Sequence, residues 1–233
     1  MANNYYDMTG VLMVEKVTPI IRALFEAFEL DARDDATGEV YIADIAESTS
    51  HSWDSVGDHI DSDLIEALGI DIDGFDDLDI DARLKRLAEH FKVSDRSEIV
   101  SFFDDTDFDE EANLDDLVFL AKSFDDGHGL TGYRIEGCWH SSKPRLFEFG
   151  GHGEFFGAYY TVSESSDRIN SLGLSVEKAL AGGDAATAAK QFADRFTGMI
   201  NGIRDETLRA QVTQQVLARM TPTVPPSTER QTA

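Results

Sequence analysis

The sequence predicts an α+β protein with an acidic, mostly helical N-terminal half, a small antiparallel β-meander and a C-terminal helical module. Three observations predict this arrangement. Apolar residues recur at helical spacing through much of residues 17–124 and 164–220. Residues 131–163 are instead rich in aromatic residues, β-branched residues and glycine, as is typical of strands joined by turns. The excess negative charge is confined to residues 31–130.

The N-terminal region is predicted to hold five helices and one short strand. Alternating side chains predict the strand at residues 39–45. In the second helix, Trp53, Ile60 and Leu64 fall on one buried side, and Gly69 is placed to end the helix. The five helices are predicted at residues 17–29, 50–68, about 79–91, 97–103 and 113–124.

The C-terminal region is predicted to begin with a three-stranded meander, whose turns lie at residues 141–144 and 150–153. Three helices follow, at about residues 164–181, 184–203 and 205–220. The sequence therefore predicts an acidic helical region at 1–127, a meander with its helical module at 128–220, and a disordered tail at 221–233.

The negative charge is local rather than general. Residues 31–130 carry 30 acidic and seven basic residues, whereas residues 131–233 carry 11 of each. Adaptation to high salt would acidify the whole surface, and a disordered acidic tail would lack the regular Leu, Ile and Phe of this segment. The pattern indicates a folded acidic region, and a merely solvated charged surface is the alternative interpretation.

Composition also predicts where the protein resides. Cys138 is the only cysteine and cannot form an internal disulfide, as is usual in a reducing compartment. The first ten residues lack the basic and apolar segments of a signal peptide, and the apolar runs are too short to span a bilayer. We therefore expect a soluble cytoplasmic protein with no membrane partner.

The clustered aspartates do not match a calcium-binding loop. An EF-hand needs an oxygen ligand at its fifth position, but loops begun at Asp71 or Asp104 place Phe75 or Phe108 there. The sequence therefore predicts no metal site and no cofactor.

A transition-metal or nucleophilic site is an alternative hypothesis, built around Cys138, His140 and His152, and an enzymatic site would include Glu154 as well. Cys138 and His140 alternate on one strand and so share a face, and His152 is predicted to approach from the next turn. No pair of these residues has the CxxC or HxxxH spacing of a known zinc site, and a lone buried cysteine with two turn histidines is the commoner explanation. The sequence therefore predicts neither a metal ligand nor a catalytic residue here.

The acidic region is better interpreted as a ligand for a basic partner. A chain with a net charge of −25 and no Lys/Arg stripe is repelled by phosphate, which argues against direct nucleic-acid binding. At the charge density of duplex DNA, one charge per ~1.7 Å, a net charge of 23 corresponds to roughly 40 Å of helix axis.

In composition and charge layout, about 100 residues of this chain resemble the acidic anti-defence proteins of phages and plasmids. Those proteins are DNA mimics that block restriction enzymes or CRISPR effector complexes. The resemblance implies a non-enzymatic inhibitor that occupies the cationic groove of a nucleic-acid-binding protein or complex. It assigns no individual residue.

The residues predicted to contact such a partner are acids on helix faces and in the loops between them. They are Asp54, Asp58, Asp61, Asp63, Asp71, Asp73, Asp76, Asp77, Asp79, Asp81, Asp104, Asp105, Asp107, Asp109, Glu110, Glu111, Asp115 and Asp116. A further alternative is an interaction module that forms a homodimer through the C-terminal helices, with the acidic surface serving solubility.

Overall fold

The computed structural model describes residues 3–31, 38–47, 49, 51–70, 72, 74–146 and 148–221. The chain divides into two compact units. The first comprises Met1–Ala158 and Ser163–Asn170, and the second comprises Tyr159–Val162 and Ser171–Ala233.

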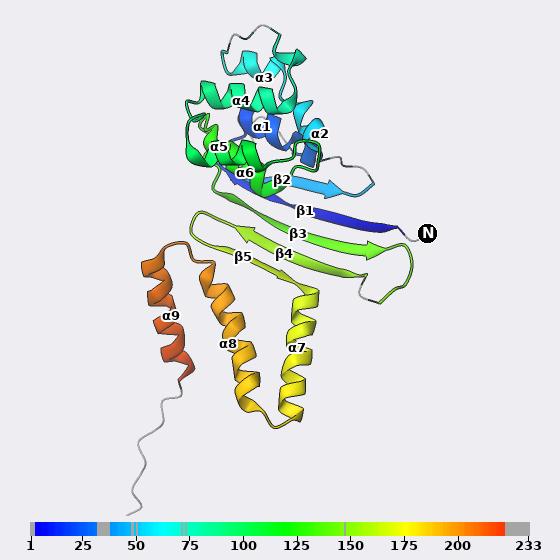
Figure 1. Cartoon of the computed structure of the whole chain (residues 1–233), viewed down its shortest axis with the longest axis vertical. Helices are drawn as coiled ribbons and strands as arrows, with labels where there is room; N and C mark the ends of the chain where they lie inside the picture. Colours follow the sequence, from blue (N-terminus) through cyan, green and yellow to red (C-terminus); the bar gives the residue numbers. More distant parts are fainter. Residues whose placement is uncertain are drawn as a thin grey trace, which may run out of the picture. The chain divides into compact units, whose positions relative to one another are not determined.

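The first unit combines a sheet with a layer of short helices (Figure 1). Its elements in chain order are β1 (Asn4–Val14), α1 (Pro19–Phe25), η1 (Glu26–Phe28), β2 (Gly38–Ile45), α2 (Trp53–Gly57), α3 (Ser62–Ala67), η2 (Phe75–Asp77), α4 (Ile80–His90), α5 (Ser97–Asp105), α6 (Leu114–Ser123), β3 (Gly132–Ser141) and β4 (Gly150–Phe156). β5 (Thr161–Ser165) and α7 (Ser166–Ala181) each contribute residues to both units.

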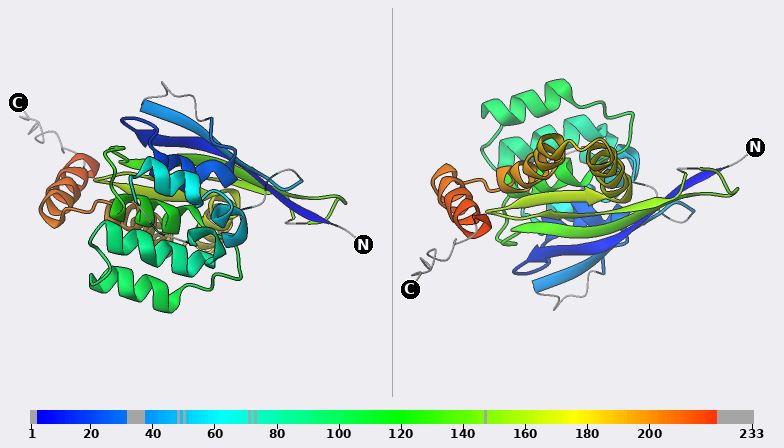
Figure 2. Two further views of the ribbon diagram at one scale, coloured as in Figure 1. Left: turned by 90° about the horizontal axis from the view of Figure 1, so that it is seen from above. Right: turned by 90° about the horizontal axis from the view of Figure 1, so that it is seen from below.

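The strands form one five-stranded sheet in the order β2-β1-β3-β4-β5. Figure 2 shows them side by side with a pronounced twist. β1 lies between β2 and β3 in the sheet and pairs antiparallel with both. β2 lies near the start of the acidic segment, residues 31–130, and β3 directly follows its end. β3 in turn pairs antiparallel with β4.

The core lies between this sheet and the helices α1–α6, which cover one face of it (Figure 1). Alternation along β1 places Leu12 and Val14 on the covered face, and Ile42 of β2 and Ile135 of β3 join them there. Tyr133 of β3 is also buried on this face. The helices are short and amphipathic, so their stability comes from this packing rather than from helix propensity.

The prediction of a mostly helical N-terminal half is wrong. Residues 4–14 form β1, and β1 and β2 make up one side of the sheet. The strand was missed because its hydrogen-bonding partner β3 lies more than a hundred residues away, and only such a partner stabilises an isolated extended segment. The protein is α+β, but β3, β4 and β5 do not form a separate central meander, because β1 and β2 extend them into one five-stranded sheet.

Two local predictions are also corrected. The helix expected at residues 50–68 is two helices, α2 and α3, because Asp61 accepts backbone hydrogen bonds from Asp63 and Leu64 and starts a new helix. The turn expected at residues 150–153 is the first half of β4, whose glycines pair with β3.

The boundary expected at residue 127 does not coincide with the division into compact units. β3 and β4 belong to the first unit because β3 pairs with β1 over ten positions. The tail expected at residues 221–233 lies, apart from residue 221, outside the described residues.

The second unit contains residues 171–181 of α7, followed by α8 (Ala185–Asn201) and α9 (Glu206–Met220). Aspartates cap two of these helices, since Asp184 accepts the Thr187 N–H and Asp205 accepts the Leu208 N–H. Among the described hydrophobic residues of this unit, only Ala179 and Ala188 are buried. Over the described ranges, none of the helices has the length and apolar character needed to cross a membrane.

The position of β1 in the middle of the first unit's core predicts a steep cost for shortening Leu12, which is fully buried. We expect Leu12→Ala to lower the free energy of unfolding by about 2–5 kcal/mol, because it leaves a cavity. Val11→Ala, on the uncovered face of the same strand, is the matched control and should cost less. Urea unfolding measures both, and equal losses would contradict this placement of β1.

Candidate functional site

The predicted partner-binding acids lie at the surface of the first unit. Asp71 and Asp73 lie outside the described residues. Of the sixteen others, thirteen are exposed and none is buried. These sixteen belong to the helices α2 to α6 and to the loops between them, so they decorate the helical layer and not the sheet.

Several of these acids also hold the fold together. Asp61 and Asp79 cap α3 and α4, because their side chains accept backbone N–H groups at the helix starts. Asp76 accepts the Ser62 N–H at 2.9 Å, and Asp107 accepts the Asp109 N–H at 3.0 Å. Asp is favoured over Glu at such positions because its short side chain reaches nearby backbone groups. Part of the aspartate enrichment therefore has a local structural cause.

Seven other acids are exposed and make no side-chain hydrogen bond or ion pair with the described part of the chain. They are Asp54, Asp58, Asp63, Asp77, Asp104, Asp109 and Glu110. Within the described ranges, their carboxylates are available to a partner without first breaking an internal contact.

One basic side chain of this region donates to backbone carbonyl groups and, within the described ranges, forms no ion pair with these acids. The Arg83 guanidinium donates to the carbonyl oxygens of Gly57 and Ile60 at 3.0 and 2.9 Å. It also donates to those of Leu78 and Asp76 at 2.8 and 2.7 Å. Arg83 thereby joins α4 to the preceding loops, and its charge serves the fold.

The acidic loop between α5 and α6 is fixed to the frame by backbone hydrogen bonds. The Trp53 N–H donates to the Glu110 carbonyl at 3.2 Å, and the Ala112 N–H donates to the His51 carbonyl at 2.8 Å. Ser52 and Glu111 form a β-bridge between these two contacts. The loop therefore presents its carboxylates from a defined backbone position.

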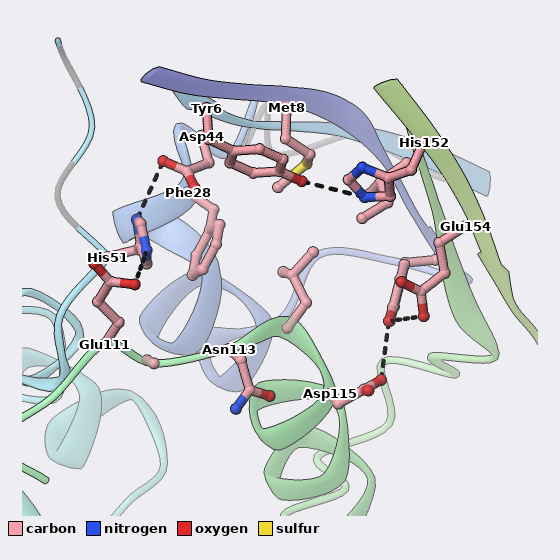
Figure 3. A pocket seen from close by; sticks show the side chains of 14 residues that line it. Tyr6, Met8, Phe28, Asp44, His51, Glu111, Asn113, Asp115, His152 and Glu154 are labelled. Carbon is pink, nitrogen blue, oxygen red and sulfur yellow. Dashed lines mark hydrogen bonds and ion pairs between the residues drawn. The ribbon is translucent and has the colours of Figure 1, made fainter. Parts of the chain in front are cut away.

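A pocket of about 420 Å³ opens between the sheet and the N-terminal end of α6 (Figure 3). Its walls combine aromatic and aliphatic side chains with four carboxylates and two histidines. None of the fourteen described residues that line it is Lys or Arg. The lining consists of Tyr6, Met8, Phe28, Asp44, His51, Glu111, Ala112, Asn113, Leu114, Asp115, Tyr133, Ile135, His152 and Glu154.

At one end of the pocket, His51 lies between two carboxylates (Figure 3). Its Nδ1 is 3.1 Å from the buried Asp44, and its Nε2 is 3.4 Å from the exposed Glu111. The close contact with the Asp44 carboxylate raises the pKa of His51, and partial burial opposes this rise. This end of the pocket therefore favours a protonated imidazole.

At the other end, the Tyr133 hydroxyl lies 2.9 Å from both Asp115 and Glu154. Burial first, and then the negative charge of Asp115, raises the pKa of Tyr133 above its ordinary value, so the phenol keeps its proton. A hydroxyl has one hydrogen and can donate it to only one of the two carboxylates at a time. The other carboxylate has acceptor capacity left for a cationic group.

Tyr6 and His152 form the wall along the sheet. The Tyr6 hydroxyl is 3.3 Å from Nε2 of His152, and their rings stack with centroids 5.7 Å apart. Burial first, and then the charge of Asp44, raises the pKa of Tyr6 to about 12. A Cβ at Gly137 would lie 2.6 Å from this hydroxyl, so glycine at 137 makes room for the pair.

A second acidic hollow, of about 400 Å³, adjoins the first through two shared lining residues, Glu111 and Asn113. The buried Trp53 forms part of its wall, and its acids are Asp105, Asp107, Glu110, Glu111 and Asp116. The acidic loop thus separates two hollows that both offer carboxylate acceptors. Chemically, such hollows suit guanidinium or ammonium groups.

The residues of the enzymatic alternative do not form one site. β3 pairs Gly137 with His152 and Ile135 with Glu154, so His152 and Glu154 lie on the helix-covered face. Cys138 and His140 point to the opposite face. His152 was expected in a turn, and its place inside β4 is the reason for this separation.

The pocket also contains residues that the sequence interpretation did not select, namely Tyr6, Asp44, His51 and Tyr133. Tyr6 was missed together with β1, and Asp44 was recognised only as a position in a strand. The local signal that marks Asp44 is a carboxylate on the inward face of an otherwise apolar strand, after Val40 and Ile42.

No protein-family model, curated protein or solved structure matches this chain.

The His51–Asp44 pair predicts a pH-dependent contribution to stability. Because the pKa of His51 is raised in the folded state, its contribution is full below about pH 6.5, the ordinary pKa, and is lost as the pH rises through the raised value. We expect the difference in free energy of unfolding between the native chain and His51→Gln to be larger at roughly pH 5.5 than at roughly pH 8.5. Urea unfolding at both pH values measures it, and a difference independent of pH would contradict the pairing.

Proposed function

We propose that this protein binds the cationic, nucleic-acid-binding surface of another protein or complex and inhibits it by occupying that surface. The observation that carries the proposal is the set of seven exposed acids without a side-chain partner in the described part of the chain. They lie on a folded helical layer. No chemistry is required of the chain in this function.

Rigidity supports this proposal. A charged side chain that is held by a fixed backbone loses less conformational entropy on docking than one on a flexible tail. The loop carrying Asp109 and Glu110 is fixed by the contacts of residues 51–53 described above. The short aspartate side chains leave few rotamers to be ordered.

The two hollows support a particular mode of contact. An arginine of the partner can place its guanidinium against the carboxylates of either hollow, and in the first hollow its planar face can also lie against the exposed Tyr6 ring. Phosphate groups are repelled by the same surface, so nucleic acid competes for the partner rather than binding to the chain.

Neutralising three of the free acids tests the proposal. We expect Asp104→Asn, Asp109→Asn and Glu110→Gln together to weaken binding to a basic partner by on the order of tenfold, since exposed ion pairs contribute about 0.2–1 kcal/mol each. The partner is obtained by pull-down from the native host with washes at two salt concentrations. Affinities are then measured with the purified pair.

The matched control neutralises three exposed acids of the second unit, as Glu177→Gln, Asp194→Asn and Glu206→Gln. It changes the net charge by the same amount but should leave the affinity unchanged. Equal weakening by both variants would mean that only net charge matters. Full binding by the first variant would mean that the acidic loop is merely a solvated surface, and either result would overturn the proposal.

A second candidate function, self-association through the C-terminal helices, is favoured by a different observation. Large apolar side chains of the second unit are exposed at helical spacing, as at Phe192, Phe196 and Met199 of α8. Leu208 and Leu217 of α9 are exposed too. A surface of this kind is typical of interaction sites. We propose a second copy as the occupant, because residues 131–233 carry equal numbers of acids and bases and copies do not repel each other there.

Replacing Phe192 and Phe196 with serine tests this second candidate. We expect the double variant to be monomeric by sedimentation equilibrium at concentrations where the native chain is dimeric, because it removes two apolar anchors. Lys190→Ser with Asp194→Ser is the matched control, with the same spacing on the same helix, and should stay dimeric. A native chain that is monomeric at all concentrations would exclude self-association.

A further inference from the structure

Three different metal-ligating side chains meet on the face of the sheet opposite the pocket. Asp7 of β1 and Cys138 of β3 are directly paired across the strands, and His140 lies two residues beyond Cys138 on the same face. One ligand atom of each of these residues lies within 4.8 Å of those of the other two. The three come from adjacent strands of a regular sheet, so the backbone holds them in register.

Two of these side chains are oriented by neighbours. Asp7 accepts the Ala46 N–H through Oδ1 at 3.1 Å, which fixes the carboxylate and leaves Oδ2 for another ligand. The His140 ring stacks on the Tyr5 ring with centroids 5.2 Å apart, which limits its rotation. Contacts of this kind, which orient a ligating residue from outside the coordination sphere, are a regular feature of metal sites.

The donor set decides the class of ion. Thiolate sulfur, imidazole nitrogen and carboxylate oxygen together suit zinc, whereas calcium and magnesium take oxygen ligands almost exclusively. At ordinary zinc–ligand bond lengths of about 2.0–2.3 Å, ligand atoms of one site lie roughly 3–4 Å apart. Small side-chain rotations therefore bring these three atoms into coordination.

We propose that Asp7, Cys138 and His140 form a binding site for one zinc ion. Three protein ligands leave the fourth tetrahedral position to water, because Cys138 is exposed and the site faces solvent. This proposal differs from the expectation, made from the sequence, that the chain holds no metal. The sequence did not identify Asp7 as a ligand, because Asp7 lies 131 residues from Cys138 and meets it only in the folded sheet.

Binding at this site joins β1 to β3 and releases protons. Coordination needs the thiolate and the neutral imidazole, so the affinity falls as the pH is lowered. The bound ion also stabilises the folded chain, because the unfolded chain does not hold the three ligands together. The site therefore has two readouts, one spectroscopic and one from thermal unfolding.

Cobalt(II) titration of the full-length chain tests the proposal, with a non-thiol reductant keeping Cys138 reduced. We expect one equivalent of Co²⁺ to produce the near-ultraviolet charge-transfer band of a thiolate–cobalt bond, and Zn²⁺ to remove that band by competition. Zn²⁺ should also raise the melting temperature. Cys138→Ser should abolish the band, and Asp7→Asn and His140→Gln should each weaken Co²⁺ binding by at least about tenfold.

His152→Gln is the matched control. His152 pairs with Gly137 beside Cys138 but points into the pocket on the other face of the sheet (Figure 3), so the variant should bind Co²⁺ like the native chain. Absence of the band in the native chain overturns the proposal. So does a band that persists unchanged in both Asp7→Asn and His140→Gln, since Cys138 would then be binding cobalt without this site. Native-like unfolding curves of the variants without metal exclude misfolding as the cause of a loss.

Discussion

β1 pairs with β3 over ten residue positions, and this pairing joins two segments that lie more than a hundred residues apart. The covered face of the resulting sheet supplies the platform on which α1–α6 pack. Tyr6 and His152 lie at the end of the same face and line the acidic pocket. The opposite face brings Asp7 beside Cys138. Both candidate binding sites of the first unit therefore depend on this one register.

The aspartates of the helical layer have two physical roles. Asp61 and Asp79 cap the starts of α3 and α4, and the helices of this layer are short enough to depend on packing against the sheet. Asp104 and Asp109 make no such contact within the described ranges. The first role builds a rigid frame and the second projects charge from it. A basic partner would meet both kinds of residue, but only loss of the second kind would weaken binding without destabilising the fold.

Elements that depend on residues close together in the sequence could be predicted, whereas those that depend on distant residues could not. The strand at residues 38–45 and the helices α4 and α6 follow from local alternation and apolar stripes, and the structure contains them close to the expected positions. β1 depends on a distant partner, and the break between α2 and α3 depends on one capping aspartate. The exposed acids were identified from charge alone. The pocket was not, because Asp44, His51 and Tyr133 meet only after the sheet has formed.

The central claim is that the acidic layer takes the place of nucleic acid on a basic partner. Its most direct test is competition: the affinity of the captured partner for duplex DNA or RNA is measured at increasing concentrations of this chain and at two ionic strengths. The account predicts that the chain displaces the nucleic acid completely, and that its own affinity for the partner falls steeply as salt rises. A ternary complex of partner, nucleic acid and chain, stable at moderate salt, would contradict it.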